Sequence, residues 1–199
     1  ALPEGYELPA YADTDWTVVT GAVINAVNEV AAQGVNLIVD YSPAGVGRNV
    51  RMLREVSRRT NVHIICASGL YRTAWDAVPP ELDKFDVDQL AQHFIRELTQ
   101  GTEGTGVRAG FIKLSVGDDG PLPRDEMIYR SAARAAIETG ATIGMHARTV
   151  RGVSAALAIL TSEKLDLERY IWAHAARDGA TDYAALKAIA DRGAYISFD

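Results

Sequence analysis

The sequence predicts an α/β fold of the (β/α)8 barrel class, and three observations support that prediction. Six short, almost continuously apolar segments alternate with six segments in which apolar residues recur at helical spacing. Strands that are apolar on both faces are typical of parallel sheets covered by helices. No G-x-G-x-x-G turn follows the early strands, since the stretch from Asp40 reads DYSPAGVG, and this disfavours an open dinucleotide-binding sheet.

The expected strands are apolar runs whose length is typical of buried strands. They cover residues 35–40, 62–69, 109–116, 141–147, 170–175 and 194–199. Capping residues support several of the expected helices: Gly34 closes the first, Asp86 opens the third and Gly140 closes the fourth. The helices cover residues 16–34, 47–60, 86–101, 124–140, 152–165 and 181–193.

The number of strand–helix units is smaller than a complete barrel needs. Such a barrel has eight units and about 250 residues, whereas this chain has 199 residues, opens on a helix and ends on a strand. We therefore expect one barrel domain over residues 1–199, with about six of the eight units present and both ends truncated. The irregular stretch 70–85 is the expected place for an active-site loop.

Composition and charge indicate which kinds of molecule the protein binds. The formal net charge of −6 and the pI near 5.2 argue against a nucleic-acid or anionic-membrane surface, since both favour a basic patch. No apolar run is long enough to span a bilayer. Cys66 is the single cysteine, which excludes an internal disulfide framework and favours a reducing compartment such as the cytoplasm. We expect a small-molecule substrate, with no nucleic acid and no membrane as partner.

Lys113 stands in the middle of the apolar run AGFIKLSV, residues 109–116. A buried ammonium group costs several kcal/mol unless it is paired or chemically changed. Lysine is rarely fully buried without a partner. We therefore expect Lys113 to point into a site that uses it.

Two of the four histidines close consecutive expected strands, His146 in GMHA and His174 in WAHA. Catalytic groups of a (β/α)8 barrel sit at the C-terminal ends of its strands. Neighbouring strands lie about 4.8 Å apart, which suits two imidazoles that share one metal ion at about 2.0–2.1 Å each. Lys113 lies one strand earlier at the same level. His63, at a strand start, and His93, within a helix, are expected to be structural.

The order lysine, histidine, histidine on three successive strand ends resembles the phosphotriesterase family of the amidohydrolase superfamily. The residues that carry it read GFIKLSV, GMHARTV and WAHAARD. Residues 34–71 resemble the second and third strand–helix units of that family, and residues 96–113 resemble the approach to its lysine strand. Two ligand elements of the family are absent from this sequence: the His-x-His pair of the first strand and the aspartate that ends the eighth.

The resemblance implies a hydrolase with two divalent metal ions, zinc first, with manganese, cobalt and iron as alternatives. Lys113 would carry a CO2-derived carbamate that bridges the metals, so it would be an anionic ligand rather than a buried cation. His146 and His174 would hold the more exposed metal. A hydroxide that bridges the metals would attack an ester, lactone or phosphotriester, since metal binding lowers the pKa of water to about 7.

Further residues take their expected roles from the same resemblance. Tyr71, in SGLY, matches an aromatic residue that is often tyrosine in lactonase-type members, which favours lactonase or esterase activity over organophosphate hydrolysis; its alternative role is to pack the loop. Asp178 is the candidate proton relay and Arg177 a candidate substrate contact. Asp199 matches the end of the seventh strand, just before the substrate pocket. Members of that family are often homodimers, so the resemblance raises a homodimer as one assembly for this chain, although no feature of the sequence demonstrates it.

Two other functions stay open on the sequence. A Schiff-base lyase or aldolase barrel also places a lysine inside a strand, although that mechanism does not need two strand-end histidines. A non-catalytic, degenerate family member that acts as a binding scaffold is the other alternative, because a barrel without two of its strands leaves edges unpaired and apolar surface bare. Asp40 is expected to anchor the loop that follows it.

Overall fold

Parallel strands and the helices that cover them alternate along the chain. The structure is a computed structural model that describes residues 11–73, 78–175 and 182–198. The helices are α1 (Trp16–Ala31), α2 (Val50–Thr60), α3 (Val87–Thr99), α4 (Pro123–Thr139), α5 (Val150–Ser162) and α6 (Tyr183–Ala190), with 3-10 helices η3 (Pro80–Lys84) and η4 (Leu167–Arg169). The strands are β1 (Leu37–Val39), β2 (His63–Ile65), β3 (Ala67–Ser68), β4 (Phe111–Ser115), β5 (Ile143–His146), β6 (Tyr170–Ala173) and β7 (Tyr195–Ile196).

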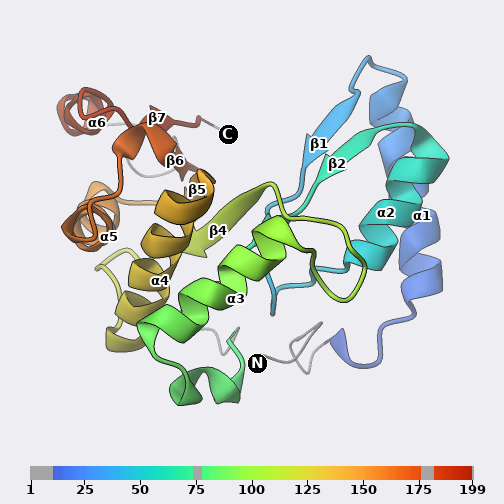
Figure 1. Cartoon of the computed structure of the whole chain (residues 1–199). Coiled ribbons are helices and arrows are strands. Elements are labelled where there is room, and N and C mark those ends of the chain that lie inside the picture. Colours follow the sequence, from blue (N-terminus) through green and yellow to red (C-terminus); the bar gives the residue numbers. More distant parts are fainter. Residues whose placement is uncertain (1–10, 74–77, 176–181, 199) are drawn as a thin grey trace.

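All the strand pairs of the two described sheets are parallel. β1 pairs with β2, and five strands follow the order β3-β4-β5-β6-β7. Figure 1 shows α3 and α4 beside β4 and β5, while α1 and α2 lie beside β1 and β2 at the other end of the molecule. β1, β3, β4, β5 and β6 are each followed by a helix that returns the chain to the edge from which the next parallel strand starts, as the sequence predicts.

The prediction of one continuous strand over residues 62–69 is wrong. β2 pairs with β1, whereas β3 pairs with β4, and Cys66 lies between the two segments. The chain changes its hydrogen-bonding neighbour at this point because β1 and β2 diverge from β4 (Figure 1). The two 3-10 helices were not expected either, and η3 lies within the irregular stretch 70–85.

The outer face of the five-stranded sheet forms the main core. Ile112, Leu114, Met145, Tyr170 and Trp172 alternate with inner-face residues along β4, β5 and β6, and all five are fully buried. α4 covers this face largely with alanine side chains, which let the helix approach the sheet closely. Burial of each large side chain contributes roughly 1.5–3 kcal/mol, so this layer holds the inner face in place.

The inner face is closed around Lys113 and open at its two ends. Lys113 is 2% exposed, whereas Leu37 and Val39 of β1 are 48% and 43% exposed and Tyr195 of β7 is 62% exposed. They alternate with the half-buried Ile38 and Ile196, which pack against the helix-covered cores, so these exposed side chains lie on the face opposite the helices. The inner face therefore remains apolar at both ends of the sheet, where its side chains are exposed to solvent.

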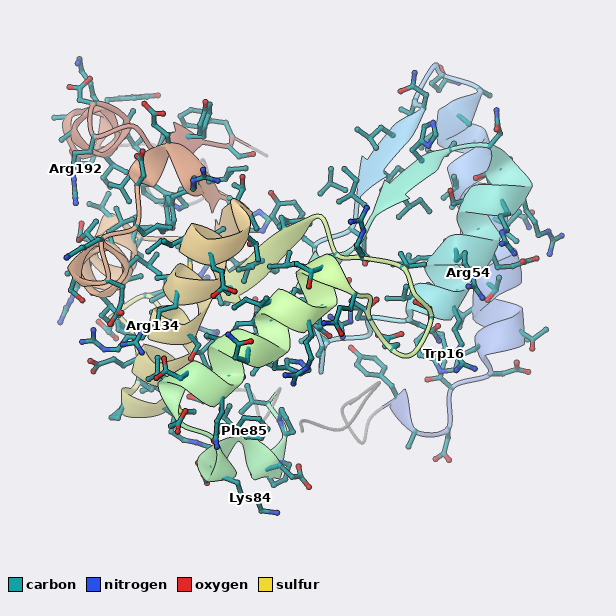
Figure 2. The ribbon with its side chains drawn as sticks, viewed as in Figure 1. Trp16, Arg54, Lys84, Phe85, Arg134 and Arg192 are labelled. Carbon is teal, nitrogen blue, oxygen red and sulfur yellow. The ribbon has the colours of Figure 1, made fainter. Side chains whose placement is uncertain are left out.

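Arginines on the outer surface join the helices. Figure 2 shows Arg134 on α4, and its guanidinium lies 2.6 Å from Asp88 and 2.9 Å from Glu163. Exposed ion pairs of this kind contribute only about 0–1 kcal/mol each. Within the described segments, no helix is both long enough and apolar enough to cross a bilayer.

A buried ion-pair network ties β3 to α3 and to the start of α2. Arg48 donates to both carboxylate oxygens of Glu97, at 2.6 and 3.1 Å, and to the carbonyl of Ala67 at 2.9 Å. Its Nε donates to Glu103 at 2.9 Å. Ser68 Oγ also donates to Glu97, at 2.7 Å. Segments far apart in the sequence are thereby fixed to the strand that adjoins Lys113.

Burial disfavours the charged forms of Arg48 and Glu97, but the attraction between the two groups and the hydrogen bonds that join them outweigh this effect. Desolvation raises the pKa of a carboxyl group, yet Arg48 beside it holds the pKa of Glu97 below its ordinary value. Burial likewise opposes the charge on Arg48, and the two glutamates nevertheless raise its pKa. Each charge therefore depends on its partner.

Glu97→Gln should destabilise the protein by about 3 kcal/mol, since it removes one of the two carboxylates that neutralise a buried guanidinium and leaves only Glu103 as its counter-charge. The carboxylate of Glu97 stabilises the fold above its ordinary pKa of 4.5, and this contribution disappears as the pH falls through the lower folded value. Urea unfolding from pH 7 to pH 3 should therefore show a smaller acid loss in the variant than in the parent. Glu126→Gln, at an exposed i,i+4 pair with Arg130, is the control and should change little; equal effects would contradict the network's importance.

Candidate metal centre

Lys113 lies at the centre of β4, with the backbone of β5 beside it. The register pairs Lys113 with Gly144 and Ser115 with His146. The Nζ atom of Lys113 donates to the main-chain carbonyl of Leu114. Nothing charged in the described residues offsets its burial, so burial lowers the pKa of Lys113 to about 7. The amine therefore has a substantial neutral, nucleophilic population near neutral pH.

Two glycines make room for the lysine and its surroundings. Gly69, with φ of +99°, lies so close to β4 that a Cβ atom there would be 2.2 Å from the carbonyl oxygen of Lys113. A Cβ on Gly144 would be 2.9 Å from the ring of Tyr41. Both positions therefore require glycine, one for the backbone of Lys113 and the other for the aromatic ring next to it.

His146 and His174 come together as the sequence predicts, with ring centroids 4.6 Å apart and ring planes at 64°. His146 ends β5, and His174 directly follows β6. The turn after His146 is fixed because Trp172 Nε1 donates to the carbonyl of Ala147 at 2.7 Å. Two imidazoles at this separation can converge on one ion.

His174 adopts a left-handed backbone conformation, with φ of 67°. A residue with a side chain costs of order 1–3 kcal/mol in such a conformation and persists there only when its surroundings hold it. The amide of Ala175 donates to the carbonyl of Ser197 at 3.0 Å and anchors the turn. This strain sits at the point where the imidazole leaves the strand.

Burial lowers the pKa of His146 to about 4, and the neighbouring Lys113, His174 and two arginines add to the shift. The imidazole of His146 is therefore neutral at pH 7. A neutral imidazole keeps a lone pair for a metal.

Two tyrosine rings flank the lysine. Lys113 Nζ lies 5.4 Å from the ring centroid of Tyr71 and 5.8 Å from that of Tyr41. The Tyr71 ring also lies 5.8 Å from the imidazole of His146. Tyr71 was predicted to belong to the site and lies there. Tyr41 was not predicted, although its place directly after a strand-end Asp40 was a usable signal.

Ser115 is a second residue that sequence reasoning missed. It is fully buried, and its Oγ has no hydrogen-bond partner in the part of the chain that the structure describes. It lies on the inner face because it is two residues from Lys113 along the same strand. Its position next to a strand-end histidine in the register was the signal available, but only the structure shows that its hydroxyl is unsatisfied.

The other predicted residues have different outcomes. Arg177, Asp178 and Asp199 lie outside the described residues, so their roles stay predictions. Asp40 accepts a hydrogen bond from Ser42 Oγ at 2.9 Å, which confirms that it anchors the following loop. The remaining histidines do not join the site: His63 is exposed at the start of β2, and His93 lies on α3 at 3.7 Å from Glu97.

The donor set suits a divalent metal. Neutral imidazoles are ligands of zinc and of neighbouring transition metals, and a neutral lysine amine can react with CO2 to give an oxygen donor. Within the described segments no three histidine, cysteine or carboxylate side chains converge. Among the described residues, Lys113 is therefore the candidate for a further protein ligand of a metal held by His146 and His174.

Comparison with known proteins agrees with this geometry. The model of the phosphotriesterase family matches residues 8–199. The chain is 32% identical over 179 residues to an aryldialkylphosphatase of Saccharolobus solfataricus, covering 88% of this chain and 56% of the relative. It is 26% identical over 170 residues to the N-acetyltaurine hydrolase of Homo sapiens, covering 84% and 48%. A crystal structure of the phosphotriesterase homology protein from Escherichia coli, with phosphate in its active site, matches with a TM-score of 0.82 and 26% identity, covering 99% of this chain and 71% of that one.

The match to that solved structure confirms the predicted (β/α)8 barrel type of fold. The chain belongs to the phosphotriesterase family. It spans about half the length of the curated relatives it matches: for example, 50% of a phosphotriesterase-related protein of Nematostella vectensis and 60% of the curated Escherichia coli relative.

His174→Gly should leave the stability of the metal-free protein unchanged or raise it by up to about 1 kcal/mol, since glycine relieves the left-handed strain. The same change should lower zinc affinity strongly because it removes a ligand. Lys164→Gly is the matched control, as Lys164 has φ of 69° after α5. Urea unfolding and zinc titration separate the two properties. If zinc affinity falls equally in both variants, His174 has no special part in metal binding.

Proposed function

We propose that the protein is a metal-dependent hydrolase that cleaves an ester, lactone or phosphotriester. The observation that carries this proposal is that the buried Lys113 and two histidines in ring contact, His146 and His174, lie on or directly after three neighbouring strands. Lys113 is buried without a described charged partner and has a pKa of about 7, and His146 beside it has a pKa of about 4. Such strongly perturbed groups cluster at functional sites.

His146 and His174 would hold one divalent metal, zinc in the first instance. The lone pair of Lys113 Nζ would form a bond to the carbon of CO2, one C=O electron pair would move to oxygen, and one Nζ proton would pass to solvent. The resulting carbamate would offer one oxygen to each of two metals. A buried cation would thereby become an anion compensated by metal charge.

When bound, the metals would lower the pKa of a bound water to about 7 and would polarise the scissile group as Lewis acids. The chain's own residues would shape the space in which they act. Tyr71, in contact with both His146 and Lys113, would form the wall that substrate meets and keep water away from the carbamate. Asp178 would accept a proton, while Arg177 and Asp199 would contact substrate.

Lactones and simple esters are the substrates we favour, because a tyrosine at position 71 resembles the lactonase-type members. The relatives carry the names of a phosphotriester hydrolase and of an amide hydrolase. These names support hydrolysis as the reaction type and leave the bond to be determined by a substrate screen that begins with lactones and proceeds to phosphotriesters.

One observation also favours a Schiff-base lyase. A buried lysine with a pKa of about 7 is a competent amine nucleophile towards a carbonyl substrate. That function gives no role to the paired histidines, which is why we rank it second. Borohydride reduction in the presence of carbonyl substrates would trap Lys113 covalently if it applies, and mass spectrometry of the digested protein would show the adduct.

Metal content per chain is the direct test of the first proposal. Protein expressed from the complete reading frame should contain about two divalent metals per chain, the stoichiometry of a two-metal site. Chelation should abolish hydrolysis, and zinc with bicarbonate should restore it. Folded protein that takes up no metal under these conditions would instead support the lyase or the non-catalytic scaffold.

Lys113→Ala should abolish both metal binding and hydrolysis, since it removes the bridging group. Short carboxylic acids such as propionate should restore part of the metal content by standing in for the carbamate. Lys84→Ala, at a lysine of η3, is the control and should retain both properties. Full metal content and activity in Lys113→Ala without added acid would exclude the bridge.

A further inference from the structure

We propose that the hydroxyl of Ser115 donates a hydrogen bond to the carbamate of Lys113 and so acts as a positioning residue for the metal bridge. This inference rests on the proposed function. It assigns a role to a buried polar atom that the fold leaves unsatisfied. Ser115 follows Lys113 by two residues on β4, and both side chains point to the inner face.

Among the described residues, the hydroxyl of Ser115 has no hydrogen-bond partner. Ser115 is 0% exposed, and no hydrogen bond is found for its Oγ. Its main chain is held in place, since the hydroxyl of Tyr129 donates to the Ser115 carbonyl at 2.6 Å. A buried hydroxyl without a partner is unfavourable by about 1–3 kcal/mol, so a state of the protein in which a new group accepts its hydrogen bond is favoured by a comparable amount.

The lysine side chain reaches towards Ser115. Two residues of a strand advance about 6.6 Å, a distance that the flexible four-carbon stem of lysine can cover. Nζ already donates to the carbonyl of Leu114, the residue between the two. The rings of Tyr41 and Tyr71 flank Nζ, and the Tyr41 ring occupies the space above Gly144. The C-terminal end of β4, where Ser115 and His146 stand in register, is thus the direction in which the side chain extends.

Carbamylation changes what the lysine can offer to a hydroxyl. An ammonium group has donors but no acceptor, whereas a carboxylate-like group accepts through both oxygens. Each carbamate oxygen that binds one metal keeps a second lone pair for a donor. Bonds of this kind, from a neutral donor to an anion, are shorter and stronger than neutral ones. Ser115 would therefore favour the carbamylated state over the free amine.

Ser115→Ala tests this role because the substitution should stabilise the metal-free protein but weaken formation of the carbamate. In the metal-free protein, removal of the unsatisfied hydroxyl should raise the melting temperature by about 2–4 °C. In the loading experiment, the bicarbonate concentration that gives half-maximal zinc content should rise by about tenfold or more. The carbamate signal from 13C-bicarbonate in NMR spectra should weaken in parallel at a fixed bicarbonate concentration.

Ser131→Ala is the matched control, because Ser131 is equally buried but its hydroxyl already has hydrogen-bond acceptors, the carbonyls of Met127 and Val87 at 2.8 and 2.9 Å. That variant should lower the melting temperature and leave the bicarbonate dependence unchanged. An unchanged bicarbonate dependence in Ser115→Ala overturns the role of Ser115 while the parent still loads metal. A parent protein that loads no zinc at any bicarbonate concentration overturns the proposed function, and the role of Ser115 with it.

Discussion

The position of β3 beside Lys113 depends on one buried guanidinium. Arg48 lies just before α2, yet its partners are the carbonyl of Ala67 on β3, Glu97 on α3 and Glu103 after that helix. Because all of these groups are buried or nearly so, their geometry is fixed by desolvation as well as by attraction. The strand that leads into Gly69 and Tyr71 is therefore held by charges that have no role in the proposed chemistry.

The site itself is built by the absence of side chains as much as by their presence. Gly69 lets the end of β3 lie against the backbone of Lys113, and Gly144 leaves the space that the Tyr41 ring fills. The lysine is consequently surrounded by main chain and aromatic carbon, which cannot stabilise an ammonium group as water does. The low pKa of Lys113 follows from this packing, so the electrostatics of the site are a consequence of how closely three strands approach.

The sequence was a good guide where local patterns determine structure. All six expected helices form, and the strands fall within the predicted ranges, because apolar periodicity and caps such as Asp86 act within a few residues. The pairing of His146 with His174 could be inferred as well, since parallel strands bring their ends together. The Arg48–Glu97 pair could not be inferred, because its partners are 49 residues apart and no periodicity connects them. The unsatisfied hydroxyl of Ser115 could not be inferred either, since it depends on the positions of every neighbouring donor and acceptor.

The division between β2 and β3 places Cys66 where it can report on local opening of the structure. Cys66 is the only cysteine of the sequence, it is 3% exposed, and burial raises the pKa of its thiol. A thiol in that state reacts slowly with alkylating reagents, because only the exposed thiolate is reactive. Under native conditions, the rate at which the Cys66 thiol is alkylated would depend on how often the junction between the two sheets opens. The natural sequence therefore contains a probe of local unfolding at this junction.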